Sequence, residues 1–250
     1  MKIARFHYQE RELYGAVEEQ QVKIIEGDIY GSYRVTEEVL PLADVRLLAP
    51  VKPSKVIGVG LNYQSVAKDK GVEFPAEPIL FLKPPSGIIG PGDSVIIPEL
   101  VKKPVFEVEL AVIIGKTAKN VTEETALDYC LGYTLANDIT AKDHMIKGQP
   151  WAKGKSFDTF TPVGPYIVTG IDPENTEITL LLNGEQKQHS STQDMIFGVR
   201  KVIAFISQVM TLEAGDLIIT GTPLGGGDFA AGDVFTLASP AIGTITNPVR

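Results

Sequence analysis

The stretch "VFEVELAVIIG", residues 105–115, has the composition of a buried β-strand interrupted by two carboxylates, Glu107 and Glu109. Successive side chains of a strand point to opposite faces, so the two glutamates share one face, which Ala111 and Ile113 continue as apolar. Side chains at this spacing lie roughly 7 Å apart, near enough for two negative charges to repel each other. We therefore expect a buried strand beside which another group offsets this repulsion.

The overall composition excludes several classes of partner. Of the 250 residues, 44% are hydrophobic and 22% are charged, which is ordinary for a soluble globular protein. The formal net charge of −8 argues against nucleic acid or an anionic membrane as a partner, because the summed field would repel either one. No run approaches the roughly 18 apolar residues of a membrane span, and the start, "MKIARFHYQERELYG", has charges where a signal peptide is apolar. We expect a cytoplasmic protein.

The single cysteine, Cys130, excludes an internal disulfide and fits a reducing compartment. A lone cysteine within a strand-like segment is more often a small buried apolar side chain than a nucleophile. We expect no chemistry from it.

The chain divides near residue 50. Residues 1–50 contain three short strand-like pieces, "KIARFHY", "LYGAVEE" and "QVKIIEG", and end at "LLAPVKPSK", whose two prolines mark a joint. This pattern predicts a small β-rich N-terminal domain, residues 1–50, before a larger domain, residues 51–250. Strand signals also dominate the larger part, so the predicted fold class is α+β and mostly β. These signals are "KVIGVG", "PILFLKP", "SVIIP", "GYTLAND", "GPYIVTG", "EITLLLNGEQK", "DLIITGTP" and "VFTLASP".

Turns and helices leave fewer signals. Asn183-Gly184 is the dipeptide favoured in two-residue hairpin turns. One helix is expected to open at Thr122 and to stop near Gly132, and a second to open around Ser191 or Thr192. The second has one apolar stripe that should pack on the sheet. Its members are Met195, Ile196, Val199, Val202, Ile203 and Ile206.

A polar segment, residues 135–165, lies between two strand signals. Asp138, at the end of "YTLAN", would complete a set of three carboxylates with Glu107 and Glu109. Three hard oxygen ligands suit Mg²⁺, Mn²⁺ or Ca²⁺ far better than zinc. The alternative is that the glutamates are solvated on an open sheet face, and the pattern alone leaves both interpretations open.

The same segment gathers lysines in an otherwise acidic chain: Lys142, Lys147, Lys153 and Lys155. Such a cluster would suit an anionic substrate beside a metal, and a solvated loop is the alternative. The stretch "GTPLGGGD", residues 221–228, has neither the lysine nor the following helix of a phosphate-binding loop.

The three histidines share no spacing typical of a metal site, so each is better explained as a surface or packing residue. His144 is the one that could act chemically. It directly follows "NDITAKD" and could reach the same cavity as a general base.

Six motifs resemble those of the fumarylacetoacetate hydrolase superfamily in order and spacing, over about residues 50–250. This resemblance implies a mixed, mostly β roll-like catalytic domain, usually in a homodimer, that acts on small 2-oxo acids by cleavage, decarboxylation or isomerisation. The motifs are "GVGLNYQSVAKDKG", "FEVELAVIIGK", "GYTLANDITAKD", "GKSFDTFTPVGP", "STQDMIF" and "ITGTPLGGG".

The resemblance also implies roles for individual residues. Glu107, Glu109 and Asp138 become the ligands of a divalent cation, Mg²⁺ or Mn²⁺ with Ca²⁺ as an alternative. Lys155 of "GKSFD" resembles the family lysine beside the metal and substrate, and Thr222 of "GTP" the threonine that contacts the substrate carboxylate. The further substrate contacts expected from these motifs are Lys142, Tyr63 and Asp158.

Three positions depart from the family pattern. The family commonly shows "NYxxHAxE" where this chain has "NYQSVAKD", so Val66 replaces the histidine and Asp69 the glutamate. Lys142 stands where "TARD" has arginine, and Met145 where a glutamine often follows. The usual histidine-carboxylate base is therefore missing.

This absence bears on the reaction. Hydrolysis of a β-diketone needs a base that activates water, typically worth about 10²–10⁴ in rate, and valine cannot supply it. Decarboxylation or isomerisation proceeds through an enolate that a metal stabilises directly. The sequence thus slightly favours a metal-dependent decarboxylase or isomerase of a small 2-oxo dicarboxylic acid, with Glu107 and Lys155 in catalytic roles.

Two alternatives stay open. One is hydrolysis of an acylpyruvate or a fumarylacetoacetate-type bond, with His144, Asp69 or metal-bound water as the base. The other is a metal-binding protein that holds ligands without turning them over. The segment 62–78, polar and bounded by prolines, is expected to act as a lid in either enzyme.

Overall fold

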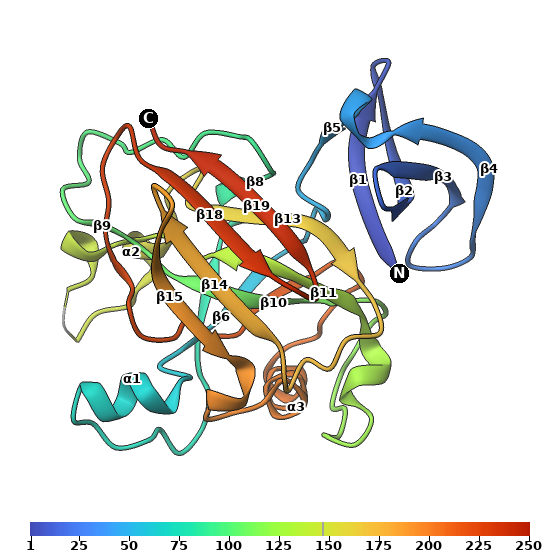
Figure 1. Cartoon of the computed structure of the whole chain (residues 1–250). Helices are drawn as coiled ribbons and strands as arrows, with labels where there is room; N and C mark the ends of the chain where they lie inside the picture. The colour runs from blue at the N-terminus through green and yellow to red at the C-terminus, as the bar shows by residue number, and fades with distance from the viewer. Residues whose placement is uncertain (147) are drawn as a thin grey trace.

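The computed structural model describes residues 1–146 and 148–250, and it confirms the mostly β fold class (Figure 1). The N-terminal strands form an antiparallel meander in the order β1–β2–β3–β4, with β5 paired to β1. The bounds are β1 (Lys2–Tyr8), β2 (Arg11–Glu18), β3 (Gln21–Gly27), β4 (Tyr33–Pro41) and β5 (Arg46–Leu47).

β1, β2 and β3 match the three pieces expected from the sequence, whereas β4 and the two-residue β5 were not predicted. Most side chains of β4 are exposed, so it lacks the apolar alternation that marks a strand. The meander, blue in Figure 1, stands beside the rest of the molecule but is not detached from it. β1 pairs with β13 (Thr161–Val168) through Lys2 and Ile3, which extends the main sheet into the N-terminal part. A domain boundary near residue 50 stays a prediction.

The main sheet continues in the order β13–β11–β10–β16–β6–β7, and β8 pairs with β13. Its central strand is β10, in which every residue is buried. β10 runs antiparallel to β11 and β16, and β16 runs parallel to β6. The bounds are β6 (Val56–Gly60), β7 (Ile79–Lys83), β8 (Ile88–Ile89), β10 (Val108–Ile114), β11 (Cys130–Asn137) and β16 (Leu217–Ile219).

Two smaller sheets complete the fold: a three-stranded sheet in the order β12–β9–β17 and a four-stranded sheet in the order β15–β14–β18–β19. The bounds are β9 (Pro104–Phe106), β12 (Thr140–Ala141), β14 (Glu177–Leu182), β15 (Glu185–Ser191), β17 (Gly227–Asp228), β18 (Val234–Ser239) and β19 (Gly243–Pro248). The hairpin expected at Asn183-Gly184 is confirmed, since it joins β14 to β15 with positive φ at both residues, 54° and 82°.

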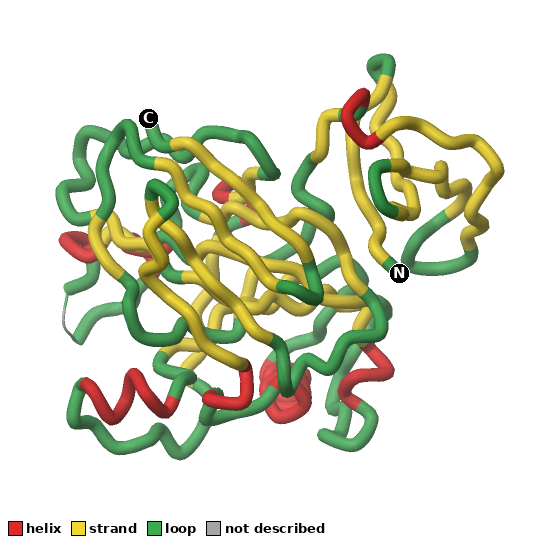
Figure 2. Tube along the Cα trace, viewed as in Figure 1, coloured by secondary structure: helices red, strands yellow, loops and turns green. Residues whose placement is uncertain are grey.

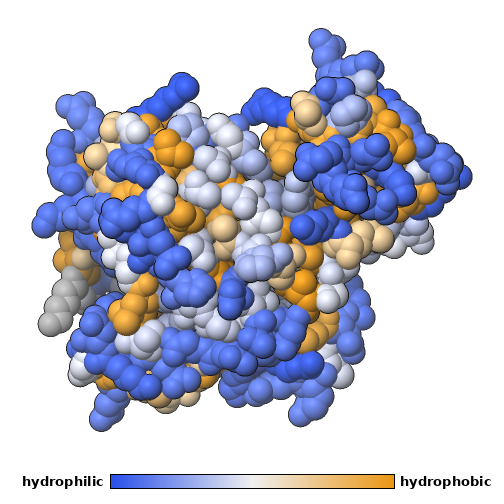
Figure 3. Space-filling model, viewed as in Figure 1, coloured by the Kyte–Doolittle hydropathy of each residue, from blue (hydrophilic) through white to orange (hydrophobic). Residues whose placement is uncertain are grey.

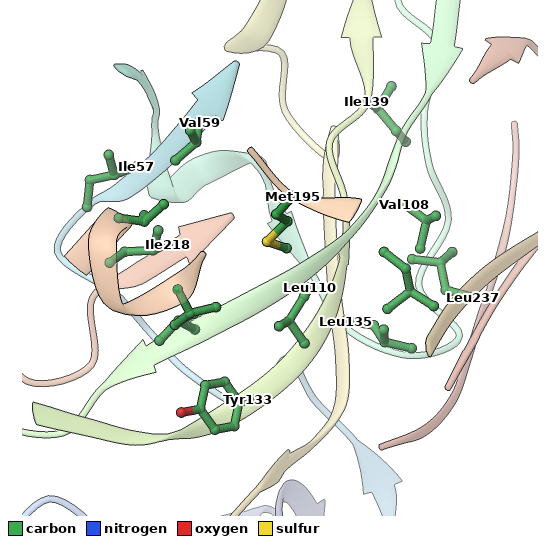
Figure 4. Close-up of a cluster of buried hydrophobic side chains, with 14 of the residues drawn as sticks. Ile57, Val59, Val108, Leu110, Tyr133, Leu135, Ile139, Met195, Ile218 and Leu237 are labelled. Atoms are coloured by element: carbon green, nitrogen blue, oxygen red, sulfur yellow. The ribbon is translucent and has the colours of Figure 1, made fainter. Parts of the chain in front are cut away.

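The largest core cluster lies between the main sheet and the four-stranded sheet. Figure 4 shows Leu110 and Leu135 of the main sheet near Leu237 of β18. The alternation expected for β10 is confirmed, because Val108 and Leu110 belong to this cluster while Ala111 and Ile113 belong to a second one. Burial on both faces fixes the register of β10, since a slip by one residue would exchange the two faces.

Helices are few and short (Figure 2). The α-helices are α1 (Gln64–Asp69), α2 (Ala152–Lys155) and α3 (Val199–Val209). Single 3-10 turns occur at η1 (Leu42–Asp44), η2 (Pro85–Gly87), η3 (Ala126–Tyr129), η4 (Lys142–His144) and η5 (Thr192–Asp194). No helix among the described residues is long and apolar enough to cross a membrane. Polar residues cover much of the face seen in Figure 3.

Both helix predictions need correction. The helix expected from Thr122 is only the turn η3, because the chain enters β11 at Cys130 and pairs there with β10. The second helix begins at Val199, because Ser191 caps the turn η5 and Met195 forms a β-bridge with Tyr63. Ile196 also precedes the helix, and the other four members of the expected stripe are buried on α3: Val199, Val202, Ile203 and Ile206.

Gly225, within residues 221–228, allows a close approach between two backbone segments. Gly225 has φ +97°, and a Cβ there would lie 2.1 Å from the carbonyl oxygen of Lys187. Gly232 has a similar φ, +95°, but a Cβ there would meet no atom within 4 Å.

We expect Gly225→Ala to lower the free energy of unfolding by more than Gly232→Ala, which should cost only the roughly 1–2 kcal/mol of a left-handed alanine. The additional loss in Gly225→Ala comes from the clash of the new methyl group with the carbonyl oxygen of Lys187, which belongs to the backbone and cannot move aside. Urea unfolding of both variants measures it, and equal losses would show that the loop moves freely.

Candidate active site

Three carboxylates converge where two strands of the main sheet end. Glu107 lies in the break between β9 and β10, Glu109 lies in β10, and Asp138 directly follows β11. One carboxylate oxygen of each lies within 4.8 Å of the others. Glu109 and Asp138 are only 2% and 1% exposed. This arrangement could hold a metal ion, because burying three carboxylates together without a cation is unfavourable.

The strand expected over residues 105–115 is broken at Glu107, which corrects the prediction of one continuous strand. The Glu107 N–H donates to Oδ1 of Asn137 (2.9 Å), and its carbonyl accepts from the N–H of Asp138 (2.8 Å). Glu109 is held separately, since its Oε2 accepts from the N–H of Gly221 (2.7 Å). Glu107 therefore joins the cluster from the break before β10, and Glu109 joins it from within β10.

Buried ammonium groups offset the repulsion among the carboxylates. Lys155, at the end of α2, donates to Oδ2 of Asp138 and to Oε2 of Glu107 (2.9 Å). Its side chain is 5% exposed. Lys142 is more open, with Nζ 3.6 Å from Oε1 of Glu107 and a side chain that is 45% exposed. These lysines supply part of the positive charge that we expected beside the strand to offset the repulsion between the glutamates.

Lys83 was not singled out from the sequence. It ends β7 and is fully buried, and its Nζ donates to Oδ1 of Asp138 (2.6 Å). Its other two donations go to the carbonyls of Ile139 and Phe160, both at 3.0 Å. The only signal in the sequence is that this lysine ends the apolar run "PILFLK". In the structure that position is buried, so the ammonium group has no access to water.

Burial and charge separate the pKa values of the cluster. Burial, then the charges of Asp138 and Glu107, raise the pKa of Glu109 well above its usual range. Burial alone would raise the pKa of Asp138, but the ammonium groups of Lys155 and Lys83 lower it. Burial opposes the charge on Lys155, yet the carboxylates of Asp138, Glu107 and Glu109 raise its pKa. Lys155 is therefore an ammonium ion at neutral pH.

A cavity of about 280 Å³ opens beside the acidic cluster. Such a volume suits a small organic acid. The walls away from the carboxylates are mainly apolar, and Lys70 adds one more cation to the lining. Apolar members of the lining include Val59, Val66, Val72, Phe81, Met145 and Trp151, and the polar members beside the cluster are Lys142, Lys155 and Thr222.

The structure thus brings together six of the residues predicted from the sequence, namely the three carboxylates with Lys142, Lys155 and Thr222. The other four lie outside the described lining of the cavity. Asp69 and Asp158 are exposed, and Tyr63 is buried with no hydrogen-bond partner for its hydroxyl among the described residues. Lys147 lies outside the described residues. The catalytic and binding roles of all these residues stay predictions.

His144 also lies outside the described lining. Its Nε2 is 3.0 Å from the carbonyl oxygen of Leu100, and its ring packs against Phe157 with centroids 5.5 Å apart. Val66, at the position where the family has histidine, does line the cavity. The described lining therefore contains no imidazole.

Cys130 has the properties of a packing residue. Burial raises the pKa of its thiol to about 12. Relative to an ordinary thiol, this lowers the thiolate fraction at pH 8 by roughly 10³-fold. We expect iodoacetamide to alkylate the native protein far more slowly than the urea-unfolded protein, and mass spectrometry measures both rates. Cys130 is partly buried, and equal rates would contradict that environment.

Comparison with known proteins agrees with this fold and site. Residues 55–250 match the family described as Fumarylacetoacetate (FAA) hydrolase C-terminal, and residues 1–50 match the family described as Rv2993c-like, N-terminal. The mitochondrial oxaloacetate tautomerase of Xenopus laevis is 42% identical over 226 residues, which cover 85% of this chain and 71% of that protein.

Two solved structures extend the comparison. The 2-hydroxyhepta-2,4-diene-1,7-dioate isomerase of Mycobacterium marinum superposes with a TM-score of 0.92 at 40% identity, covering 100% of this chain and 98% of the other. The maleylpyruvate hydrolase of Sphingobium sp. SYK-6, in complex with manganese(II) and pyruvate, has a TM-score of 0.82 at 29% identity, with the same two coverages, 100% and 98%. The family match and these similarities agree with the resemblance seen in the motifs, and the chain belongs to the fumarylacetoacetate hydrolase family.

Proposed function

We propose that this protein is a divalent-metal-dependent enzyme that interconverts the keto and enol forms of a small 2-oxo dicarboxylic acid, or decarboxylates such an acid. The observation that carries the proposal is the buried acidic cluster, held against Lys155, at one end of a small cavity with an apolar wall. Relatives of this chain are named as an isomerase, a tautomerase and a hydrolase, so the reaction has to be argued from the site.

The donor set fits Mg²⁺ or Mn²⁺, and Ca²⁺ less closely. Glu107, Glu109 and Asp138 offer three hard oxygen ligands within 4.8 Å of one another. A relative was crystallised with manganese(II) and pyruvate, a 2-oxo acid. When bound, such a cation supplies a Lewis acid that draws electrons from the 2-oxo acid and so acidifies the neighbouring C–H.

The residues of this chain then have distinct tasks. The Lys155 ammonium, whose pKa is raised by the carboxylates around it despite its burial, holds its proton and stabilises negative charge that develops on the substrate oxygen. Lys142 is the more exposed cation at the cavity and is suited to a substrate carboxylate. Val66, Phe81 and Trp151 form apolar wall that limits the access of water to the reacting atoms.

The placement of the stronger candidate bases favours enolisation over hydrolysis. Hydrolysis needs a base beside the attacking water. Val66 lines the cavity where such a base would stand, while His144 and Asp69 lie outside the described lining. Enolisation also needs an acceptor for the proton that leaves C3, but a bound cation would acidify that C–H, so a water molecule or the Glu107 carboxylate in the cavity lining suffices. Hydrolysis, which is the activity named for the Sphingobium relative, is therefore the second candidate, and a binding protein without turnover is the third.

We expect the purified protein to accelerate the enol-to-keto conversion of oxaloacetate. The conversion is measured as the loss of the ultraviolet absorbance of the enol. Rates with Mg²⁺ should exceed those with EDTA, and Lys155→Met should remove most of the metal-dependent rate. An unchanged rate with EDTA would contradict metal dependence. Release of pyruvate and a free acid from an acylpyruvate would instead support the hydrolase.

A further inference from the structure

The side chain of Gln188, in β15, joins three segments around the acidic cluster. It is 1% exposed. Its Oε1 accepts a hydrogen bond from the N–H of Val108, and its Nε2 donates to Oγ1 of Thr222 and to the carbonyl of Pro223, each at 2.9 Å. A main-chain N–H only donates and a carbonyl only accepts, so a single orientation of the amide satisfies all three partners.

The acceptor half of this amide supports the break in the strand. Val108 lies between the two glutamates, directly after the break at Glu107. Side-chain amide oxygens satisfy the main-chain N–H groups on both sides of the break: Asn137 for Glu107 and Gln188 for Val108. Buried N–H groups left without partners would cost free energy, so these two side chains stabilise the main chain at the break, which carries the Glu107 carboxylate of the acidic cluster.

The donor half sets the polarity of Thr222. The Thr222 hydroxyl donates to the carbonyl of Val108 (2.9 Å) and accepts from Gln188, which closes a ring of three hydrogen bonds through Val108, Gln188 and Thr222. Thr222 also lines the cavity. With its proton already committed, its hydroxyl offers a lone pair to a ligand. This polarity suits an enol hydroxyl rather than the carboxylate expected from the resemblance.

We propose that Gln188 is a positioning residue for both halves of the site. Its oxygen holds the break that places Glu107 in the metal-binding cluster, and its nitrogen fixes Thr222 as an acceptor for the hydroxyl of an enol substrate. This inference rests on the proposed function, because it assigns the second role to the enol form of the substrate.

The first test replaces Gln188 with methionine, which has a similar length and none of the three hydrogen bonds. The matched control is Gln186→Met, an exposed glutamine two residues earlier on β15. Titration of the metal-free proteins with Mn²⁺, followed by electron paramagnetic resonance of free Mn²⁺, measures the affinity. We expect Gln188→Met to bind Mn²⁺ about 10–100-fold more weakly, the usual cost of losing a partner behind a metal ligand, and Gln186→Met to match wild type.

The second test examines the hydrogen bond from Gln188 to Thr222 without disturbing the one from Val108 to Gln188. Thr222→Val removes the hydroxyl and leaves the bond between Gln188 and Val108 in place. We expect the KM for the enol to rise by roughly tenfold, as for loss of one ligand hydrogen bond, while the Mn²⁺ affinity stays close to wild type. Thr222→Ser, which restores the hydroxyl, should recover most of the lost affinity for the enol.

The outcomes are distinguishable. Equal Mn²⁺ affinity in wild type and in folded Gln188→Met would overturn the role of Gln188 in the metal site, with the proposed function untouched. Failure of wild type to bind Mn²⁺ would overturn the proposed function and this inference with it. If Gln188→Met does not fold, Thr222→Val decides the donor half, because an unchanged KM there overturns it.

Discussion

Replacing Glu109 with glutamine should abolish Mn²⁺ binding and lower kcat/KM on the order of 10³-fold, because loss of a direct ligand exceeds the 10–100-fold cost of losing an outer partner. The same variant should raise the thermal stability of the metal-free protein. Glu109 is 2% exposed and faces Asp138 and Glu107, whose charges raise its pKa in addition to burial. Glutamine keeps an oxygen for the N–H of Gly221 and removes the charge.

The pH dependence follows from the direction of this shift. Folding raises the pKa of Glu109 above the usual value of 4.5. The contribution of this carboxyl group to the free energy of unfolding is therefore largest below pH 4.5, and it is lost as the pH rises through the pKa of the folded state. The metal-free wild type should therefore lose stability over that range, and Glu109→Gln should lose less. Thermal unfolding across pH measures the difference, with the exposed Glu177→Gln as control. Retained Mn²⁺ binding in Glu109→Gln would contradict the assignment of this ligand.

Replacing Lys83 with methionine should lower the free energy of unfolding by about 3–5 kcal/mol, the usual cost of removing one partner of a buried ion pair. Asp138 would lose its contact at 2.6 Å and keep only the cation of Lys155, and the carbonyls of Ile139 and Phe160 would each lose a donor. Urea unfolding of the metal-free protein measures the loss, since bound metal would mask it.

Lys55→Met provides the contrast for this prediction. Lys55 also pairs with a buried carboxylate, Asp216, but its own side chain is 25% exposed. Asp216 keeps other donors: the hydroxyl of Ser54 and the N–H of Glu213 at 2.7 and 2.8 Å. We expect a loss of only about 1 kcal/mol, because the remaining carboxylate is still hydrogen-bonded. Equal losses in the two variants would show that the Lys83 contacts have no special weight.

Local periodicity predicted those parts of the fold that depend on neighbours along the chain. The alternation of β10 anticipated two buried faces, and the Asn183-Gly184 hairpin followed from the dipeptide alone. The stripe of α3 was recognised, but its start was placed too early, because the capping signal at Ser191 belongs to a separate 3-10 turn. Local signals of this kind do not show where contacts with distant segments, such as the β-bridge at Met195, determine the start of a helix.

The candidate site was predicted only in part, for a related reason. Three carboxylates with Lys142, Lys155 and Thr222 followed from motifs and family resemblance, and the structure gathers them at one cavity. Lys83 and Gln188 reach the cluster from positions distant in the sequence, through contacts that only folding creates. Apart from the apolar run that Lys83 closes, nothing near either residue in the chain marks it as part of the site.

Proton NMR in D₂O tests the central claim, that this chain enolises a 2-oxo acid at the acidic cluster with a bound cation. Oxaloacetate and an acylpyruvate would each be incubated with the protein and Mg²⁺, with Glu107→Ala as the control for spontaneous and metal-catalysed background. We predict metal-dependent deuterium exchange at C3 or pyruvate formation from oxaloacetate, faster than in the control, with the carbon skeleton of the acylpyruvate intact. Equal rates of deuterium exchange and of pyruvate formation from oxaloacetate with wild type and with Glu107→Ala would contradict enolisation at the acidic cluster.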